Sequence, residues 1–136
     1  MREIKFRAWD DVEGLMVYSD SDSEYSFFTF DKGKIIAASI YEQASGSDYE
    51  PDYKCSRELE NIMQFTGLKD RNGREIYEGD IYRVDAEDAL CGTYPVVVDE
   101  THGMRFMLGK SVICKADAIY GEVIGNVYES PEMVKP

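Results

Sequence analysis

The segment 66–81, TGLKDRNGREIYEGDI, constrains the fold most strongly, because its charges are compatible with only one hairpin register. A two-residue loop at 72–73 would set like charges directly opposite each other at two successive pairs, which destabilises an antiparallel ladder. A three-residue loop at 71–73, closed by Gly73 in the left-handed region, matches every pair instead. The facing pairs are then Asp70 with Arg74, Lys69 with Glu75 and Leu68 with Ile76. This segment is therefore predicted to be a β-hairpin.

The acidic residues of the same segment are predicted to support turns. Asp70 falls on the first turn position, where a carboxylate accepts backbone N–H groups. Gly79 permits a sharp bend, and Asp80 can brace the turn before a strand that begins at Ile81. We therefore expect Asp70, Glu75 and Asp80 to be dispersed along chain reversals, with no convergence on an ion or a cleft.

The N-terminal part reads as a β-meander. The opening EIKFRAW alternates apolar and charged residues, which is typical of a half-buried strand. The alternation predicts that Ile4, Phe6 and Ala8 face inward and that Glu3, Lys5, Arg7 and Trp9 face outward. LMVYS, FFTF and IIAASIY are the next predicted strands, with turns at DDVEG and at DKGK, where Gly33 supplies a positive φ. SDSDSE is predicted to be a solvated loop.

Residues 42–58 are polar and show no clear period, so we expect a long exposed connection there, with a short helical turn possible at CSRELEN. NIMQFT fits a strand. The predicted division is a β-meander subdomain at 1–60 and a small β-barrel subdomain at 61–136.

The C-terminal part is predicted to be a strongly curved, SH3-like barrel. YPVVVDE and MRFML flank THG and form a predicted hairpin. AIYGEVIGNVYES is a long predicted strand, with Gly121 and Gly125 where a bent or bulged strand needs them. The expected fold class is all-β with little helix, and closure of the sheet would remove exposed edges.

The charge of the chain limits its partners. The 136 residues carry a net charge of −12 with a pI near 4.4, which opposes nucleic-acid binding because that affinity depends on Lys and Arg contacts to phosphate. An acidic decoy that imitates nucleic acid is an open alternative. The sequence contains no apolar run of signal-peptide or membrane-span length, so we expect a cytoplasmic protein with no membrane partner.

Candidate chemical sites are weak. From Asp20, acids at loop positions one, three, five and twelve resemble a calcium loop, but Tyr25 stands where that loop needs glycine. His102 has no nucleophile beside it, and Glu78 with Asp80 is a common kind of turn pair. Cys55, Cys91 and Cys114 form neither a disulfide framework nor a zinc motif. We therefore predict no catalytic, cofactor-binding or metal-binding residues and no cofactor.

Aromatic side chains leave two alternatives open. They can pack between the two halves of the chain, which is the favoured alternative, or they can form an interaction surface, since aromatics anchor many interfaces. If exposed, such a surface fits a protein partner or a second copy better than nucleic acid, given the acidic charge. The residues concerned are Trp9, Tyr18, Tyr41, Tyr77, Tyr82 and Tyr120.

Three blocks of the sequence carry a family resemblance. MREIKFRAWD, MQFTGLKDRNGREIYEGDI and YGEVIGNVYESPEM resemble the YopX-like family of bacteriophage and prophage proteins, and together they span the chain. The resemblance implies an all-β protein of two small pseudo-barrel parts, of phage origin, in a bacterial cytoplasm. It implies no catalytic motif. The expected function is that of a non-catalytic accessory protein that binds another protein or itself. The decoy and a metal-dependent enzyme are the alternatives.

Overall fold

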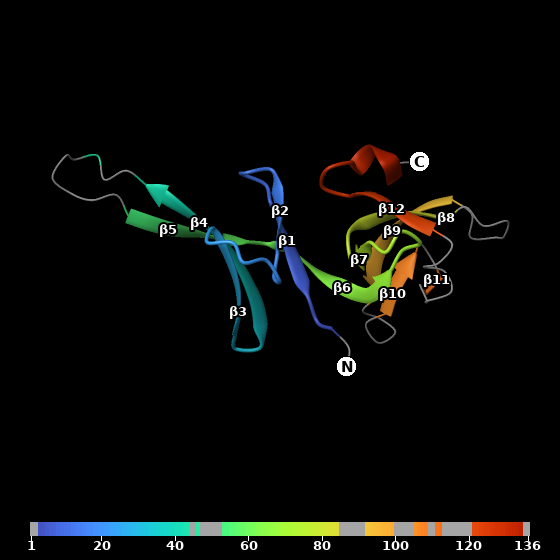
Figure 1. Ribbon diagram of the computed structural model, residues 1–136, viewed down its shortest axis with the longest axis horizontal. Helices are drawn as coiled ribbons and strands as arrows, with labels where there is room; N and C mark the ends of the chain where they lie inside the picture. Colours follow the sequence, from blue (N-terminus) through green and yellow to red (C-terminus); the bar gives the residue numbers. More distant parts are fainter. Residues whose placement is uncertain are drawn as a thin grey trace. The chain divides into compact units, whose positions relative to one another are not determined.

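The chain is built from β-strands. A computed structural model describes residues 3–43, 46, 53–84, 92–99, 105–108, 111–112 and 121–134. These residues form twelve strands and one 3₁₀ turn, with no α-helix, which confirms the predicted all-β class (Figure 1). The elements are β1 (Phe6–Asp10), β2 (Leu15–Tyr18), β3 (Ser26–Asp31), β4 (Lys34–Gln43), β5 (Tyr53–Leu59), β6 (Asn61–Lys69), β7 (Glu75–Tyr77), β8 (Asp80–Val84), β9 (Gly92–Asp99), β10 (Arg105–Leu108), β11 (Ser111–Val112), β12 (Gly121–Asn126) and η1 (Pro131–Val134).

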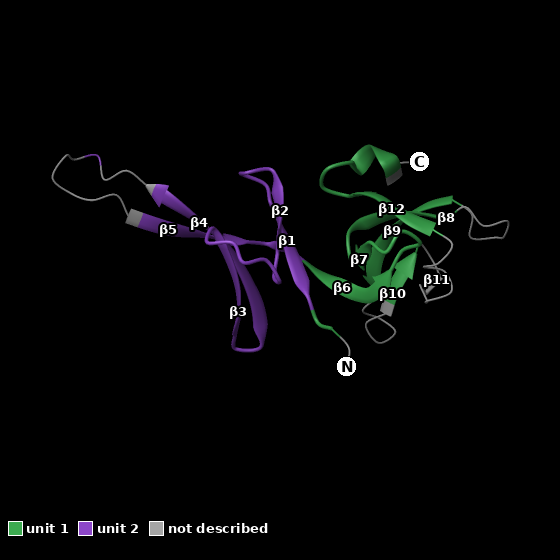
Figure 2. Ribbon diagram, viewed as in Figure 1, with its two compact units in different colours: residues 1–4, 63–136 green, residues 5–62 purple. Residues whose placement is uncertain are grey.

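The strands divide into two compact units. Unit 1 contains residues 1–4 and 63–136, and unit 2 contains residues 5–62 (Figure 2). The sequence alone predicts a division into 1–60 and 61–136.

Unit 1 is a curled antiparallel sheet in the order β11-β10-β9-β8-β12, accompanied by the β6–β7 hairpin. Its turn at Gly79 joins distant strands, because the Gly79 N–H donates to the Val96 carbonyl and the Gly79 carbonyl accepts from the Val127 N–H. The sheet therefore curls into a half-barrel, as the glycine-rich sequence indicates, while its likeness to an SH3 domain stays a prediction. The buried core consists of Ile76, Tyr82, Val84, Val96, Leu108 and Val123, with Leu68, Tyr94 and Phe106 packed against it.

The predicted three-residue turn in unit 1 is confirmed. Asp70 pairs with Arg74 through a 2.8 Å N–H···O=C bond, and Lys69 lies opposite Glu75. Gly73 has a φ of 81° and donates its N–H to the Asp70 carbonyl. Beyond this point the ladder is irregular, and the next partners along it are Phe65 and Tyr77. The expected third pair, Leu68 with Ile76, therefore falls inside the irregular stretch.

Unit 2 combines the β1–β2 hairpin with a three-stranded sheet in the order β3-β4-β5. The tight turn at Lys32-Gly33 joins β3 to β4 with a positive φ at both residues, as expected for a two-residue hairpin loop. The buried cluster is small and consists of Ala8, Ala37 and Leu59, with Val17, Phe28 and Ile62 packed against it.

The expected exposed connection at 42–58 is wrong, as is the helical turn considered at CSRELEN. Its first two residues end β4, and Tyr53–Leu59 is strand β5, which pairs with β4 from Gln43 to Ala37. The residues between these strands lie outside the described residues, except Gly46. The sequence pattern did not indicate a strand here, because β5 exposes polar residues on one face and turns Arg57 toward the other.

The expected faces of the first strand are also partly wrong. Ile4 precedes β1 and is 69% exposed, whereas Arg7 is only 2% exposed. Arg7 and Ala8 are both buried although successive strand residues point to opposite faces, so both faces of β1 are covered there. A strand covered on both sides does not show the simple alternation that the sequence analysis assumed.

Candidate functional site

The acidic residues of the central segment hold turns together. The Asp70 carboxylate is buried and accepts N–H groups from Asn72, Arg74 and Val123, at 2.9 Å each. The Asp80 carboxylate accepts the Tyr77 N–H at 2.8 Å. These acids lie along successive chain reversals, as predicted, and the Asp70 carboxylate also links its turn to strand β12.

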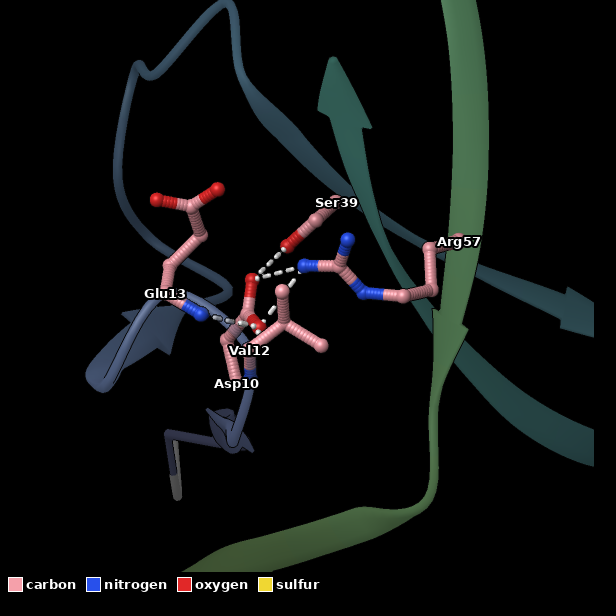
Figure 3. A network of polar contacts seen from close by, with 5 residues as sticks. All are labelled: Asp10, Val12, Glu13, Ser39 and Arg57. Atoms are coloured by element: carbon pink, nitrogen blue, oxygen red, sulfur yellow. Dashed lines mark hydrogen bonds and ion pairs between the residues drawn. The ribbon is translucent and has the colours of Figure 1, made fainter.

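A buried carboxylate that the sequence analysis did not single out organises unit 2. Asp10, at the end of β1, is 1% exposed and meets Ser39 from β4 and Arg57 from β5 (Figure 3). The Ser39 hydroxyl donates to Oδ2 at 2.5 Å, and Nη2 of Arg57 donates to both carboxylate oxygens at 2.8 and 2.9 Å. The N–H groups of Val12 and Glu13 donate to Oδ1, both at 3.1 Å. One side chain thus fixes a turn and links three strands.

These contacts also set the pKa of Asp10. Burial by itself would raise the pKa, but the hydrogen bonds from Ser39, Glu13, Arg57 and Val12 together outweigh burial and lower the pKa below its usual value of 3.8. Asp10 is therefore ionised at neutral pH. Because these donors stabilise the ionised form, the carboxylate is suited to holding structure.

Beside this network lies a hollow of about 400 Å³, the larger of two adjoining hollows that together we call the Tyr25–Tyr41 groove. Asp10, Ser39 and Arg57 contribute its polar lining, together with Glu13. The apolar lining comes from Leu15, Val17, Tyr25, Ile40 and Tyr41. The guanidinium carbon of Arg57 lies 5.7 Å from the centre of the Tyr41 ring, a cation–π contact that holds this wall in place.

The second hollow of the groove has a volume of about 260 Å³. It shares Tyr25, Ile40 and Tyr41 with the first hollow and adds Glu24, Glu42 and Lys54. Tyr25 is held by its backbone, because its carbonyl accepts the Ile40 N–H at 2.7 Å and its N–H donates to the Ser23 hydroxyl at 3.1 Å. Its side chain nevertheless remains 71% exposed. The site is thus an open, tyrosine-walled groove in unit 2.

The remaining sequence candidates divide between the two units. Tyr77 and Tyr82 are buried in unit 1, whereas Tyr18 and Tyr41 are 37% and 40% exposed in unit 2. Trp9 is half-buried. Cys55 is half-buried in β5. His102, Cys91, Cys114 and Tyr120 lie outside the described residues.

Metal coordination is limited by geometry. In the described ranges, no three His, Cys, Asp or Glu side chains are grouped so that they could hold a metal ion. The segment that resembles a calcium loop ends in strand β3, as FFTF indicates, and Asp20 lies 3.7 Å from the Lys5 ammonium.

No helix in the described part of the chain has the length and apolarity of a membrane span.

The fold and the groove define an all-β protein of two units, and the comparisons with known proteins give its family. The profile described as "YopX protein" matches residues 5–135, so the chain belongs to the YopX family. A solved structure with the same fold is the crystal structure of protein EF1440 from Enterococcus faecalis, at 29% sequence identity and a TM-score of 0.58. The match covers 99% of this chain and 100% of that one. The comparison with curated proteins found no match.

Proposed function

We propose that this chain is a non-catalytic accessory protein of a bacteriophage or prophage, which acts in the bacterial cytoplasm by binding another protein. The observation that supports binding is the distribution of exposed apolar side chains. Ten large apolar side chains among the described residues are exposed, and seven of them belong to unit 2. The seven are Val12, Leu15, Tyr18, Tyr25, Phe27, Phe30 and Tyr41.

Such a concentration favours a contact surface over chemistry. Exposed apolar side chains scattered singly are ordinary, whereas adjoining ones are typical of a surface that another molecule covers. Three of the seven, Leu15, Tyr25 and Tyr41, line one hollow. The acids with well-defined geometry, Asp10, Asp70 and Asp80, stabilise turns and strand contacts. Family membership supports the phage or prophage setting through the resemblance of the three sequence blocks.

The proposal is tested with the tagged full-length chain, expressed in bacteria that carry the encoding phage or prophage. We expect one protein to co-purify in a fixed ratio and to be lost when Tyr25, Phe27 and Phe30 are all replaced by serine. The matched control replaces Val97 and Met133, which are exposed in unit 1, by serine. This control should retain the partner. Recovery of no partner in a fixed ratio, or equal loss from both variants, would contradict the proposal.

The same preparation separates the alternatives. A decoy of nucleic acid would be indifferent to the serine replacements, because its contacts are ionic. A metal-dependent enzyme would melt at a higher temperature with Ca²⁺, Mg²⁺ or Mn²⁺, because an ion that binds only the folded state stabilises it. We expect neither response.

A further inference from the structure

We propose, on the basis of the proposed function, that the Tyr25–Tyr41 groove is the docking site and that its occupant is an extended, basic segment of a partner protein. An apolar side chain of this segment enters the larger hollow, and a neighbouring lysine or arginine meets the carboxylates of the smaller one. The proposal depends on the shape, the charge and the rigidity of the groove.

Shape favours an extended segment. The two hollows share Tyr25, Ile40 and Tyr41, so one wall separates two adjoining spaces. Side chains on the same face of an extended chain recur about every 7 Å, and two of them can therefore enter neighbouring hollows. The larger hollow, at about 400 Å³ with a mainly apolar wall, has room for one leucine-sized or aromatic side chain.

Charge favours a basic segment. Glu13, Glu24 and Glu42 line the two hollows, against the single lysine Lys54, while Arg57 is already paired with Asp10. In the smaller hollow a lysine or arginine meets the carboxylates of Glu24 and Glu42 and the exposed Tyr25 ring.

The same charge argues against a second copy as the occupant. Residues 5–62 contain thirteen aspartates and glutamates but only six lysines and arginines. Two such units brought together would repel each other, whereas a basic segment is drawn to the groove.

Rigidity favours binding without rearrangement. Asp10 fixes Arg57 with two hydrogen bonds, and Arg57 in turn lies against the Tyr41 ring. The backbone of Tyr25 is tied to Ile40. A wall that is already ordered loses less conformational entropy when a ligand binds.

The test measures fluorescence anisotropy of a labelled short lysine–leucine peptide with the repeat Leu-Ser-Lys-Ser, which places leucine and lysine alternately on one face of an extended chain, titrated with the full-length chain. The glutamate–leucine comparison peptide replaces each lysine by glutamate, and the lysine–serine comparison peptide replaces each leucine by serine. We expect binding of the lysine–leucine peptide, and binding weaker by at least about tenfold for both comparison peptides, since either the charge or the apolar anchor is missing. Equal binding of the lysine–serine peptide would overturn the groove as the site, because the attraction would then be purely ionic.

Matched variants localise the contact. Tyr25→Ser is compared with Phe30→Ser, since these side chains are 71% and 72% exposed and only Tyr25 lines the groove. Glu42→Gln is compared with Glu58→Gln, which removes the same charge from β5 outside the groove. We expect Tyr25→Ser to weaken peptide binding about tenfold or more and Glu42→Gln to weaken it measurably, with both controls unchanged. Circular dichroism melting establishes that each variant is folded.

The outcomes separate failure of the proposed docking site from failure of the proposed function. If Phe30→Ser weakens peptide binding as much as Tyr25→Ser, the groove is not the docking site. If the co-purified partner is retained by Tyr25→Ser, the groove is wrong while the proposed function stands. Absence of any partner removes the proposed function as well. Sedimentation that shows a dimer dissociated by Tyr25→Ser would replace the basic partner with a second copy.

Discussion

Asp10 connects three strands of unit 2 through one carboxylate, and only part of this role can be predicted from the sequence. The local part of its role was visible in the sequence, because aspartate at the start of DDVEG is typical of a turn whose N–H groups it accepts. Its contacts with Ser39 and Arg57 were not visible, since they bridge 29 and 47 residues. Such contacts depend on strand topology that no short pattern encodes.

Removal of the charge on Asp10 should therefore destabilise the protein. In Asp10→Asn the amide group would direct N–H donors at the donors of Ser39 and Arg57, so we expect the free energy of unfolding to fall by about 3 kcal/mol. Urea denaturation followed by circular dichroism measures this change. The neighbouring Asp11 is exposed, and Asp11→Asn should change the same quantity by less than about 0.5 kcal/mol. Equal effects of the two substitutions would contradict the structural role of Asp10.

The lowered pKa of Asp10 predicts a particular dependence on pH. Because the folded protein holds this pKa below the usual 3.8, the ionised carboxylate contributes stability that is fully present above the unfolded-state pKa and is lost as pH falls through the folded-state pKa. The difference in unfolding free energy between the wild type and Asp10→Asn should therefore be constant near neutral pH and shrink below about pH 4. Urea titrations at stepped pH test this, and a difference that stays constant into acid would refute it.

Among the elements, strands differed in how far the sequence predicted them. The β6–β7 hairpin could be predicted because its turn residues and charge pairs lie within a few positions of one another. Strand β5 could not be recognised in the same way, since its inward residues include Arg57, whose partner Asp10 lies in β1. Its exposed Lys54, Ser56 and Glu58 do alternate with more buried residues, and this period of two was the signal that the sequence offered.

Strand β12 provides a prediction about the two glycines that the sequence singled out. A Cβ at Gly121 would lie 2.6 Å from the Arg83 carbonyl oxygen and would also overlap the Tyr82 ring, whereas a Cβ at Gly125 would meet only ordinary contacts with Ser130 at 3.5 Å. Gly121→Ala should therefore lower the free energy of unfolding by about 3 kcal/mol, because backbone cannot move aside cheaply. Gly125→Ala should change it by less than about 1 kcal/mol. Chemical denaturation of both variants decides the matter, and a reversed order would show that the β8–β12 pairing is not as described.

For the whole molecule, the two units differ in the size of their buried cores. The cluster in unit 1 includes Tyr82 and Ile76, both fully buried, whereas two of the three buried members in unit 2 are alanines. Apolar burial stabilises roughly in proportion to area, so unit 1 has the larger hydrophobic contribution. Unit 2 depends more on the Asp10 network, and it also has most of the exposed large apolar side chains in the described part of the chain. The sequence revealed the charge of both units but not this division of the core.

This asymmetry predicts unequal protection in native-state hydrogen exchange. Amides in β8 and β12 should exchange only through global unfolding, whereas those in β3 and β4 should open with a free energy lower by about 2 kcal/mol, because regions with few buried apolar contacts open locally. Asp10→Asn should accelerate exchange in β4 and β5 and leave β8 and β12 comparatively unaffected, since its partners Ser39 and Arg57 belong to the former strands. Mass spectrometry of exchanged fragments resolves these strands. Uniform protection across all of them would mean that the chain unfolds as one cooperative unit, and that the small core of unit 2 does not lower its local stability.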